Sequence, residues 1–305
     1  MIETRGRRRR RGGLEPFGCR GSETVQHSRN ATREEVLARQ NVSLSGPPDA
    51  RPMVFAHGFG CDQLMWSRVA PAFEDDHRVV LFDHVGSGRS DVAAYDQRRY
   101  DTLDGYADDL AELCAALDLQ DAVVVAHSVG AMIAVLAAAR TDRIGALVLV
   151  GPSPRYLDDP SAGYVGGFRH EDVEGLLETM SSNYLGWTEA MGALVMGRDQ
   201  DPALTEELTA AFCRTDPEIA RHFAQVTFLS DNRADLARVA VPTLVVQASQ
   251  DDVAPPVVGE YVRDSIPGAR LVVVDTVGHC PHLSAPEETV AEIRAFVAGG
   301  GGGSR

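Results

Sequence analysis

One serine lies where the sequence passes from a predicted strand into a predicted helix. Ser128 is the centre of the segment AHSVG at 126–130, after a Val-Val-Val run and before a helix-forming run. A serine at such a sharp turn projects its hydroxyl from the backbone, and the amide of Val129 lies at a helix N-terminus, where it can stabilise negative charge. The usual pattern is Gly-x-Ser-x-Gly, and Ala126 replaces the first glycine. We predict that Ser128 is a nucleophile; the alternative for an isolated serine at a turn is a helix cap or a surface hydroxyl.

A glycine-rich segment supplies a second donor for the same charge. The segment HGFG at 57–60 directly follows the predicted strand at 53–56. Its two glycines let the backbone turn so that the Phe59 N–H points at the same place as the Val129 N–H. Two such donors form an oxyanion hole, and each contributes on the order of 3 kcal/mol to transition-state stabilisation. An ordinary glycine-rich turn is the alternative for this segment alone.

A histidine and a carboxylate from two later loops complete this chemistry. His279 comes just after the last predicted strand, at a carboxyl edge from which its side chain can reach the serine and act as general base. Asp251 and Asp252 follow the preceding predicted strand, and one of these carboxylates can accept the other ring N–H of His279. That contact fixes the tautomer of the imidazole and stabilises the imidazolium that forms when Ser128 loses its proton.

Two other patterns suggest ligand sites, and we reject both. His279 and His282 form a His-x-x-His pair, but no carboxylate or cysteine constellation of suitable spacing accompanies it, so we interpret His282 as structural. The run GSG at 86–88 lacks the third glycine of the dinucleotide fingerprint, and no predicted helix begins directly after it. The sequence therefore predicts no metal and no cofactor.

The elements that must position these residues alternate along the chain. From about Glu34, short apolar runs alternate with longer amphipathic ones, which is typical of a mostly parallel sheet with helices on both faces. Strands are predicted at 41–44, 53–56, 78–82, 122–126, 146–150, 243–247 and 270–274. Helices are predicted at 64–73, 103–117, 129–140, 257–265 and 286–297. The apolar stretch 122–139 is interrupted by polar side chains, which favours strand, turn and helix over a membrane span.

The alternation stops between Gly151 and Ala240, where the sequence carries only helical patterns. These patterns lie at 171–183, 188–196, 205–215 and 217–228. A helical insertion between two strands of a sheet packs over an edge of that sheet, so we predict a lid. The expected organisation is a disordered basic extension at 1–33, a core in two parts at 34–151 and 241–298, a lid at 152–240 and a flexible tail at 299–305.

Composition excludes several classes of function. All 29 basic residues are arginine, so Schiff-base, Walker-A and kinase lysine chemistries are absent. Residues 1–33 carry a charge of +6 and the remainder −21, within a net charge of −15, so we expect the body to repel nucleic acid and anionic membranes. The five cysteines are odd in number and widely spaced, which indicates no disulfide framework and fits a reducing cytoplasm. Arginine-only usage with abundant alanine is typical of a GC-rich bacterial genome.

The chain resembles α/β-hydrolases of the RsbQ-like group, which includes a bacterial energy-stress regulator of the sigma-B pathway and the plant strigolactone and karrikin receptors. The resemblance covers about 34–297 and rests on six strings. They are VFAHGFGCD at 54–62, DHVGSGRS at 83–90, HSVGAMI at 127–133, VGPSPRY at 150–156, SNYLGW at 182–187 and GHCPH at 278–282. The chain order Ser128, Asp251, His279 is also that of an α/β-hydrolase.

This resemblance implies an α/β-hydrolase fold, a mostly parallel central sheet flanked by helices, with a four-helix lid inserted after strand six. The family places its acid four residues before a proline, which favours Asp251 with Pro255, although Asp252 remains a competitor. It also implies a mainly hydrophobic pocket under the lid, and the same aromatic side chains can equally belong to the core. The matching positions are Phe59, Phe168, Trp187, Val195, Phe223 and Ser249.

These features predict a cytoplasmic, cofactor-independent serine hydrolase that cleaves an ester or lactone of a small hydrophobic molecule. The alternative is a ligand sensor that binds or slowly hydrolyses such a molecule and signals to a protein partner, and the sequence does not separate the two. A haloalkane dehalogenase would need a carboxylate nucleophile in place of Ser128.

Overall fold

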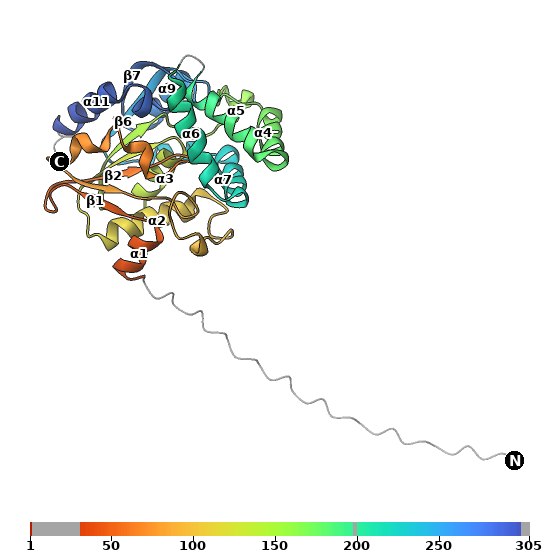
Figure 1. The fold of residues 1–305 in the computed structure, drawn as a ribbon, viewed down its shortest axis with the longest axis horizontal. Helices are drawn as coiled ribbons and strands as arrows, with labels where there is room; N and C mark the ends of the chain where they lie inside the picture. The colour runs from red at the N-terminus through yellow and green to blue at the C-terminus, as the bar shows by residue number, and fades with distance from the viewer. Residues whose placement is uncertain (2–30, 198–199, 300–305) are drawn as a thin grey trace. The chain divides into compact units, whose positions relative to one another are not determined.

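In the computed structural model, seven strands form one sheet in the order β1-β3-β2-β4-β5-β6-β7 (Figure 1). The strands are β1 (Ser43–Ser45), β2 (Pro52–Ala56), β3 (Arg78–Leu81), β4 (Ala122–His127), β5 (Ile144–Val150), β6 (Thr243–Gln250) and β7 (Arg270–Val277). Only β1 is antiparallel to its neighbour, and every other adjacent pair is parallel. This confirms the predicted mostly parallel sheet.

The structure describes Met1, residues 31–197 and residues 200–299. Most of the predicted basic extension, at 2–30, and most of the predicted tail, at 300–305, lie outside the described residues. Residues 32–197 and 200–299 belong to a single compact unit. None of the described helices combines the length and the apolar character needed to cross a bilayer.

The central strands β2 and β4 are buried along their whole length, as expected for parallel strands covered by helices on both faces. Their side chains alternate between the two faces. Val123 and Val125 pack in one core cluster with Trp66 and Phe73, whereas Val124 points to the other face. The parallel register pairs the last residues of neighbouring strands, so that the loops leaving β2, β4, β6 and β7 all emerge at one edge of the sheet.

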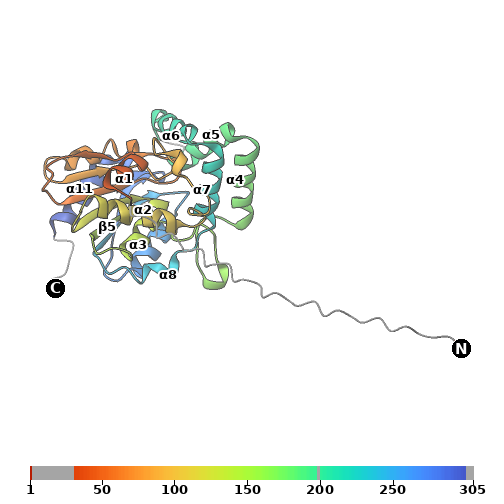
Figure 2. The ribbon, with the colours of Figure 1, turned by 90° about the horizontal axis from the view of Figure 1, so that it is seen from below.

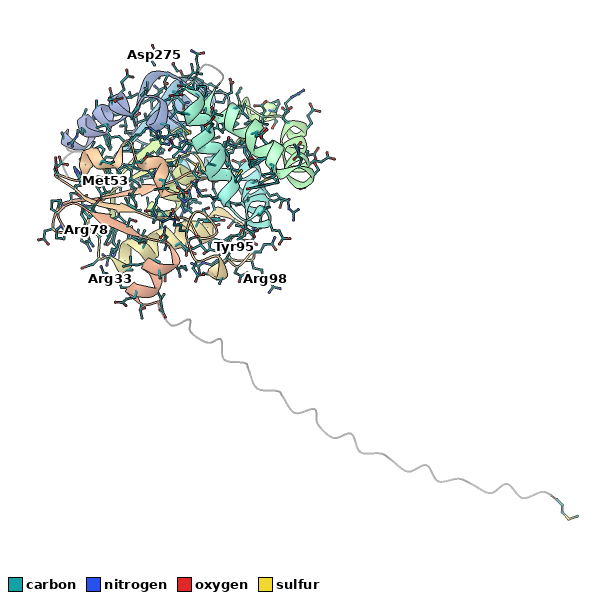
Figure 3. All side chains as sticks on the ribbon, in the orientation of Figure 1. Arg33, Met53, Arg78, Tyr95, Arg98 and Asp275 are labelled. Carbon is teal, nitrogen blue, oxygen red and sulfur yellow. The ribbon has the colours of Figure 1, made fainter. Side chains whose placement is uncertain are left out.

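Two layers of helices cover the sheet (Figures 1 and 2). On one face, consecutive contacts link α1 (Arg33–Arg39), α2 (Leu103–Ala116), α3 (Val129–Ala138), α8 (Arg233–Leu236) and α9 (Pro256–Ser265). The opposite face is covered by α10 (Pro281–Ser284), α11 (Pro286–Ala298) and two 3₁₀ helices. Met53 on β2 is buried between these layers, whereas Arg98 and Asp275 are exposed on the surface (Figure 3).

The helix predicted at 64–73 is wrong. Two short 3₁₀ helices occupy this stretch, η1 (Gln63–Trp66) and η2 (Ala70–Phe73). Pro71 has no N–H to donate and its ring obstructs the preceding turn, so one continuous α-helix cannot form here. Trp66 and Phe73 are still buried against the sheet.

Most of the other predicted elements are confirmed with small shifts at their ends. The strand predicted at 41–44 is displaced to β1, because Asn41 has a positive φ of 46° that does not fit a strand. Among the described residues, three short α-helices were not predicted: α1, α8 and α10. The first carries a readable signal, a capping box in which Thr32 accepts from the amide of Glu35.

The insertion between β5 and β6 is made of four longer helices, α4 (His170–Ser182), α5 (Tyr184–Met196), α6 (Pro202–Arg214) and α7 (Pro217–Leu229), which precede the short α8. They group together beside the sheet core (Figure 2). Helix α5 begins four residues before its predicted start at 188, because the side chain of Asn183 caps it by accepting from the Gly186 N–H. The insertion follows the fifth strand of the described chain rather than the sixth, since only four strands precede β5.

Candidate active site

Ser128 connects β4 to α3 in a strained conformation, with a φ of 56° and a ψ of −125°. A residue other than glycine rarely adopts a positive φ, so packing on both sides must hold it there. Two glycines that lie against this turn, Gly130 and Gly58, permit that packing because they have no side chain. A Cβ on Gly130 would lie 2.5 Å from the carbonyl oxygen of His57, and a Cβ on Gly58 would lie 2.6 Å from Nδ1 of His127.

Three of the predicted side chains meet at the carboxyl edge of the sheet. Ser128 Oγ lies 2.8 Å from Nε2 of His279, and Nδ1 of His279 lies 2.8 Å from Oδ2 of Asp251. All three are buried. The serine follows β4, the aspartate follows β6 and the histidine follows β7, so the parallel sheet itself brings together residues that lie far apart in the chain.

Asp251 is held by a turn that satisfies its whole carboxylate. Oδ1 accepts from the backbone N–H groups of Val253 and Ala254, both at 2.9 Å, and Oδ2 accepts from Gln247 Nε2 at 3.3 Å as well as from His279. Asp252 is exposed and takes no part in these contacts. Of the two candidate carboxylates, the structure therefore brings Asp251 to the histidine.

The predicted amide donors border the serine. Val129 is the first residue of α3, so its N–H has no partner within the helix. In the described part of the chain, no backbone or side-chain acceptor contacts the Phe59 N–H either. The close approach of Gly58 to Ser128, with an added Cβ only 3.2 Å from the serine Cβ, brings the loop at 57–60 against the start of α3. Among the described residues, the N–H groups of Phe59 and Val129 therefore have no acceptor, and these residues belong to the two segments that meet at the serine.

A polar side chain that the sequence analysis did not identify also contacts the serine hydroxyl. The hydroxyl of Tyr156 lies 3.0 Å from Ser128 Oγ, and the tyrosine side chain is buried. Burial raises the pKa of Tyr156, so its hydroxyl stays protonated at neutral pH. The string VGPSPRY at 150–156 includes this tyrosine, but nothing in its spacing from Ser128 indicates the contact.

A small cavity of about 30 Å³ adjoins Ser128 and His279. Its lining is mainly apolar and comes from both the core and the helical insertion. The lining residues are Phe59, Cys61, His127, Ser128, Tyr156, Met191, Val195, Leu208, Phe212, Thr227, Phe228, Val253, His279 and Cys280. Phe59 and Val195 are therefore in the predicted position.

Four other predicted pocket residues do not line this cavity. The ring of Trp187 packs edge-on against the ring of Phe59, at 5.9 Å between centroids. Phe223 stacks at 4.5 Å on Tyr106 of the core, and Phe168 packs against Phe228 at 6.0 Å.

The fourth residue, Ser249, donates instead to Asp275 Oδ1 and to the carbonyl of Thr276, both at 3.1 Å. The three aromatic side chains instead contact rings that line the cavity: Trp187 and Phe223 pack against Phe59, and Phe168 packs against Phe228.

His282 lies in a buried cluster with His127 and Cys280, whose possible ligand atoms lie within 4.8 Å of one another. Burial lowers the pKa of His282 to about 3 and that of His127 well below its usual value, so both rings are neutral. His127 Nε2 must donate to the carbonyl of His279, at 3.0 Å, and this same nitrogen contacts the Cys280 sulfur at 3.8 Å. A nitrogen that carries a proton offers no lone pair, so His127 does not present a metal ligand toward Cys280.

A family model, two plant proteins and a solved structure are similar to this chain over most of its length. Residues 51–286 match the family model described as the alpha/beta hydrolase fold. A karrikin insensitive 2 receptor of Petunia hybrida is 39% identical over 252 residues, 82% of this chain and 92% of that protein. A strigolactone esterase of Arabidopsis thaliana is 37% identical over 265 residues, 86% of this chain and 98% of that protein. The solved structure of a hydrolase from Oleispira antarctica has 38% identity and a TM-score of 0.85, covering 88% of this chain and 98% of that one.

Proposed function

Because the chain belongs to the α/β-hydrolase fold family, we propose that it is a serine hydrolase that cleaves an ester or lactone of a small, largely apolar molecule. The observation that carries this proposal is the pair of 2.8 Å contacts that join Ser128 to His279 and His279 to Asp251. An esterase among the relatives supports the reaction class. The reaction uses no cofactor.

In the proposed mechanism, Ser128 Oγ attacks the substrate carbonyl while His279 Nε2 removes its proton. Asp251 accepts the other ring N–H and stabilises the imidazolium. The Phe59 and Val129 N–H groups donate to the carbonyl oxygen as it becomes negative. His279 then protonates the leaving oxygen, and a water molecule activated by the same histidine releases the acid from Ser128.

The apolar lining supports a substrate with an apolar body. A cavity of about 30 Å³ holds about two water molecules, so anything larger requires the helical insertion to move away from the core. We therefore propose that the insertion, at 152–240, acts as a lid over Ser128. An ion pair joins this insertion to the core: Nη2 of Arg214, the last residue of α6, lies 2.6 Å from Oδ2 of Asp62.

A second role, as a ligand sensor of the RsbQ-like group with a protein partner, is favoured by one structural link. The backbone N–H of His279 donates to the carbonyl of Val195 on α5 at 2.7 Å, so the loop that carries the histidine is bonded directly to the insertion. A receptor among the relatives is consistent with this role. Turnover far below one per second on every short ester, together with ligand-dependent shifts in melting temperature, would favour the sensor.

The direct test of hydrolysis is Ser128→Ala with p-nitrophenyl acetate as substrate. We expect kcat/KM to fall by more than about 10⁴-fold with the fold intact, because the nucleophile is lost. Ser249→Ala is the matched control, since that hydroxyl lies outside the cavity, and it should retain activity within about twofold. Undiminished turnover by Ser128→Ala would refute the proposed nucleophile.

A further inference from the structure

Tyr156 is the second hydrogen-bond partner of the serine hydroxyl. Its Oη lies 3.0 Å from Ser128 Oγ, while His279 Nε2 lies 2.8 Å from the same oxygen. The tyrosine side chain is only 1% exposed, and Ser128 is the one hydrogen-bond partner found for its hydroxyl among the described residues. The contact is therefore shielded from bulk solvent, and a hydrogen bond to a developing charge is stronger there than in bulk water.

The direction of this hydrogen bond follows from the available protons. The ring N–H at Nδ1 of His279 is donated to Asp251, which leaves the lone pair of the neutral imidazole on Nε2. The single proton of Ser128 must then point to Nε2. Tyr156 consequently donates its proton to one of the two lone pairs of Ser128 Oγ, and the other lone pair stays available for attack on the substrate carbonyl.

The surroundings of Tyr156 hold this donor in place. Tyr156 lies six residues after the end of β5, and its ring packs edge-on against Phe228 of α7 at 5.2 Å between centroids. Burial raises the pKa of the Tyr156 phenol, so the group remains a neutral donor at neutral pH.

We propose that Tyr156 is a further catalytic residue, whose hydroxyl stabilises negative charge on Ser128 Oγ in both halves of the reaction. The inference rests on the proposed hydrolase function. In acylation the Oγ–carbon bond forms, the bond from carbon to the leaving oxygen breaks, and the serine proton passes through His279 to the leaving group. In deacylation water adds, the Oγ–carbon bond breaks, and His279 returns a proton to Oγ. Tyr156 donates a hydrogen bond throughout and transfers no proton.

The test is Tyr156→Phe, which removes only the hydroxyl. Stopped-flow release of p-nitrophenol from p-nitrophenyl acetate separates the acylation burst from the slower deacylation. A hydrogen bond to a charged group is worth enough to predict a fall of about 10-fold to 100-fold in both rates. The matched control is Tyr164→Phe, because the Tyr164 hydroxyl donates to the Arg155 carbonyl at 2.7 Å and does not contact Ser128. The control should keep both rates within about twofold.

A fluorinated tyrosine at position 156 separates donor strength from packing. 3-Fluorotyrosine keeps the ring and is a stronger donor, so the burst rate should rise above that of the wild type, whereas Tyr156→Phe lowers it. Equal rates for all three side chains, or a rate that follows the melting temperature alone, would overturn the inference. That result would leave the proposed function standing, because failure of the function itself appears separately as undiminished turnover by Ser128→Ala.

Discussion

Replacement of Asp251 by asparagine isolates the carboxylate charge without changing the size of the side chain. An asparagine has one acceptor oxygen and one NH₂ group in place of two acceptor oxygens. In the native site, Oδ1 accepts from the Val253 and Ala254 amides, and Oδ2 faces Nδ1 of His279. The new NH₂ group must face either the two amides or the histidine.

The number of buried hydrogen bonds that each orientation of the asparagine loses decides which orientation is more stable. With NH₂ toward the turn, two buried backbone donors lose their acceptor, at a cost of about 1–3 kcal/mol each. With NH₂ toward His279, both backbone bonds survive, and the ring accepts at Nδ1 by changing its tautomer. The 3.3 Å contact from Gln247 Nε2 is lost, but this nitrogen keeps its 2.9 Å bond to the Ala254 carbonyl. The second orientation is favoured, and it puts a proton on Nε2, which then cannot accept the proton of Ser128.

Asp251→Asn should therefore fold normally and lose about 10⁴-fold in kcat on p-nitrophenyl acetate, a loss of about 5.4 kcal/mol of transition-state stabilisation. Asp252→Asn is the matched control, because that side chain is exposed, and it should stay within about twofold of the wild type. Retention of more than a tenth of the activity by Asp251→Asn would refute this reasoning. A larger loss of activity in Asp252→Asn than in Asp251→Asn would also refute it, because Asp252 would then be the carboxylate that acts on His279.

Two further predictions concern stability. Burial lowers the pKa of His282 to about 3 and the pKa of His84 well below its usual value, whereas an unfolded histidine titrates near 6.5. The unfolded state then binds more protons below pH 6.5, so the melting temperature should fall steadily as pH drops from 6.5 toward 3; a melting temperature independent of pH over this range would contradict it. In Gly278→Ala, the new Cβ would lie 2.2 Å from the Met196 carbonyl at a φ of 98°, so both the free energy of unfolding and kcat should fall. Gly163→Ala is its control, with a φ of 65° but no atom within 4 Å, and urea unfolding should show a loss of only about 1–2 kcal/mol there.

The sequence alone was enough to predict the order of the seven strands and the loops that carry the chemistry. Runs such as the valines before Ser128 are short, β-branched and without a polar face, which favours strands buried on both sides. Once the strands are parallel, each loop that follows a strand lies at the same edge of the sheet. Ser128 and His279 could therefore be paired across 151 positions without any knowledge of their distance.

Only the tertiary structure decided which side chains point into the site. Asp251 and Asp252 have the same chemistry, and the turn that donates two amides to Oδ1 selects the first. Tyr156 reaches Ser128, whereas Trp187 and Phe223 do not line the cavity, because the direction of each side chain depends on how the insertion packs on the core. Composition and periodicity report burial, but they do not report which of two buried faces a ring occupies.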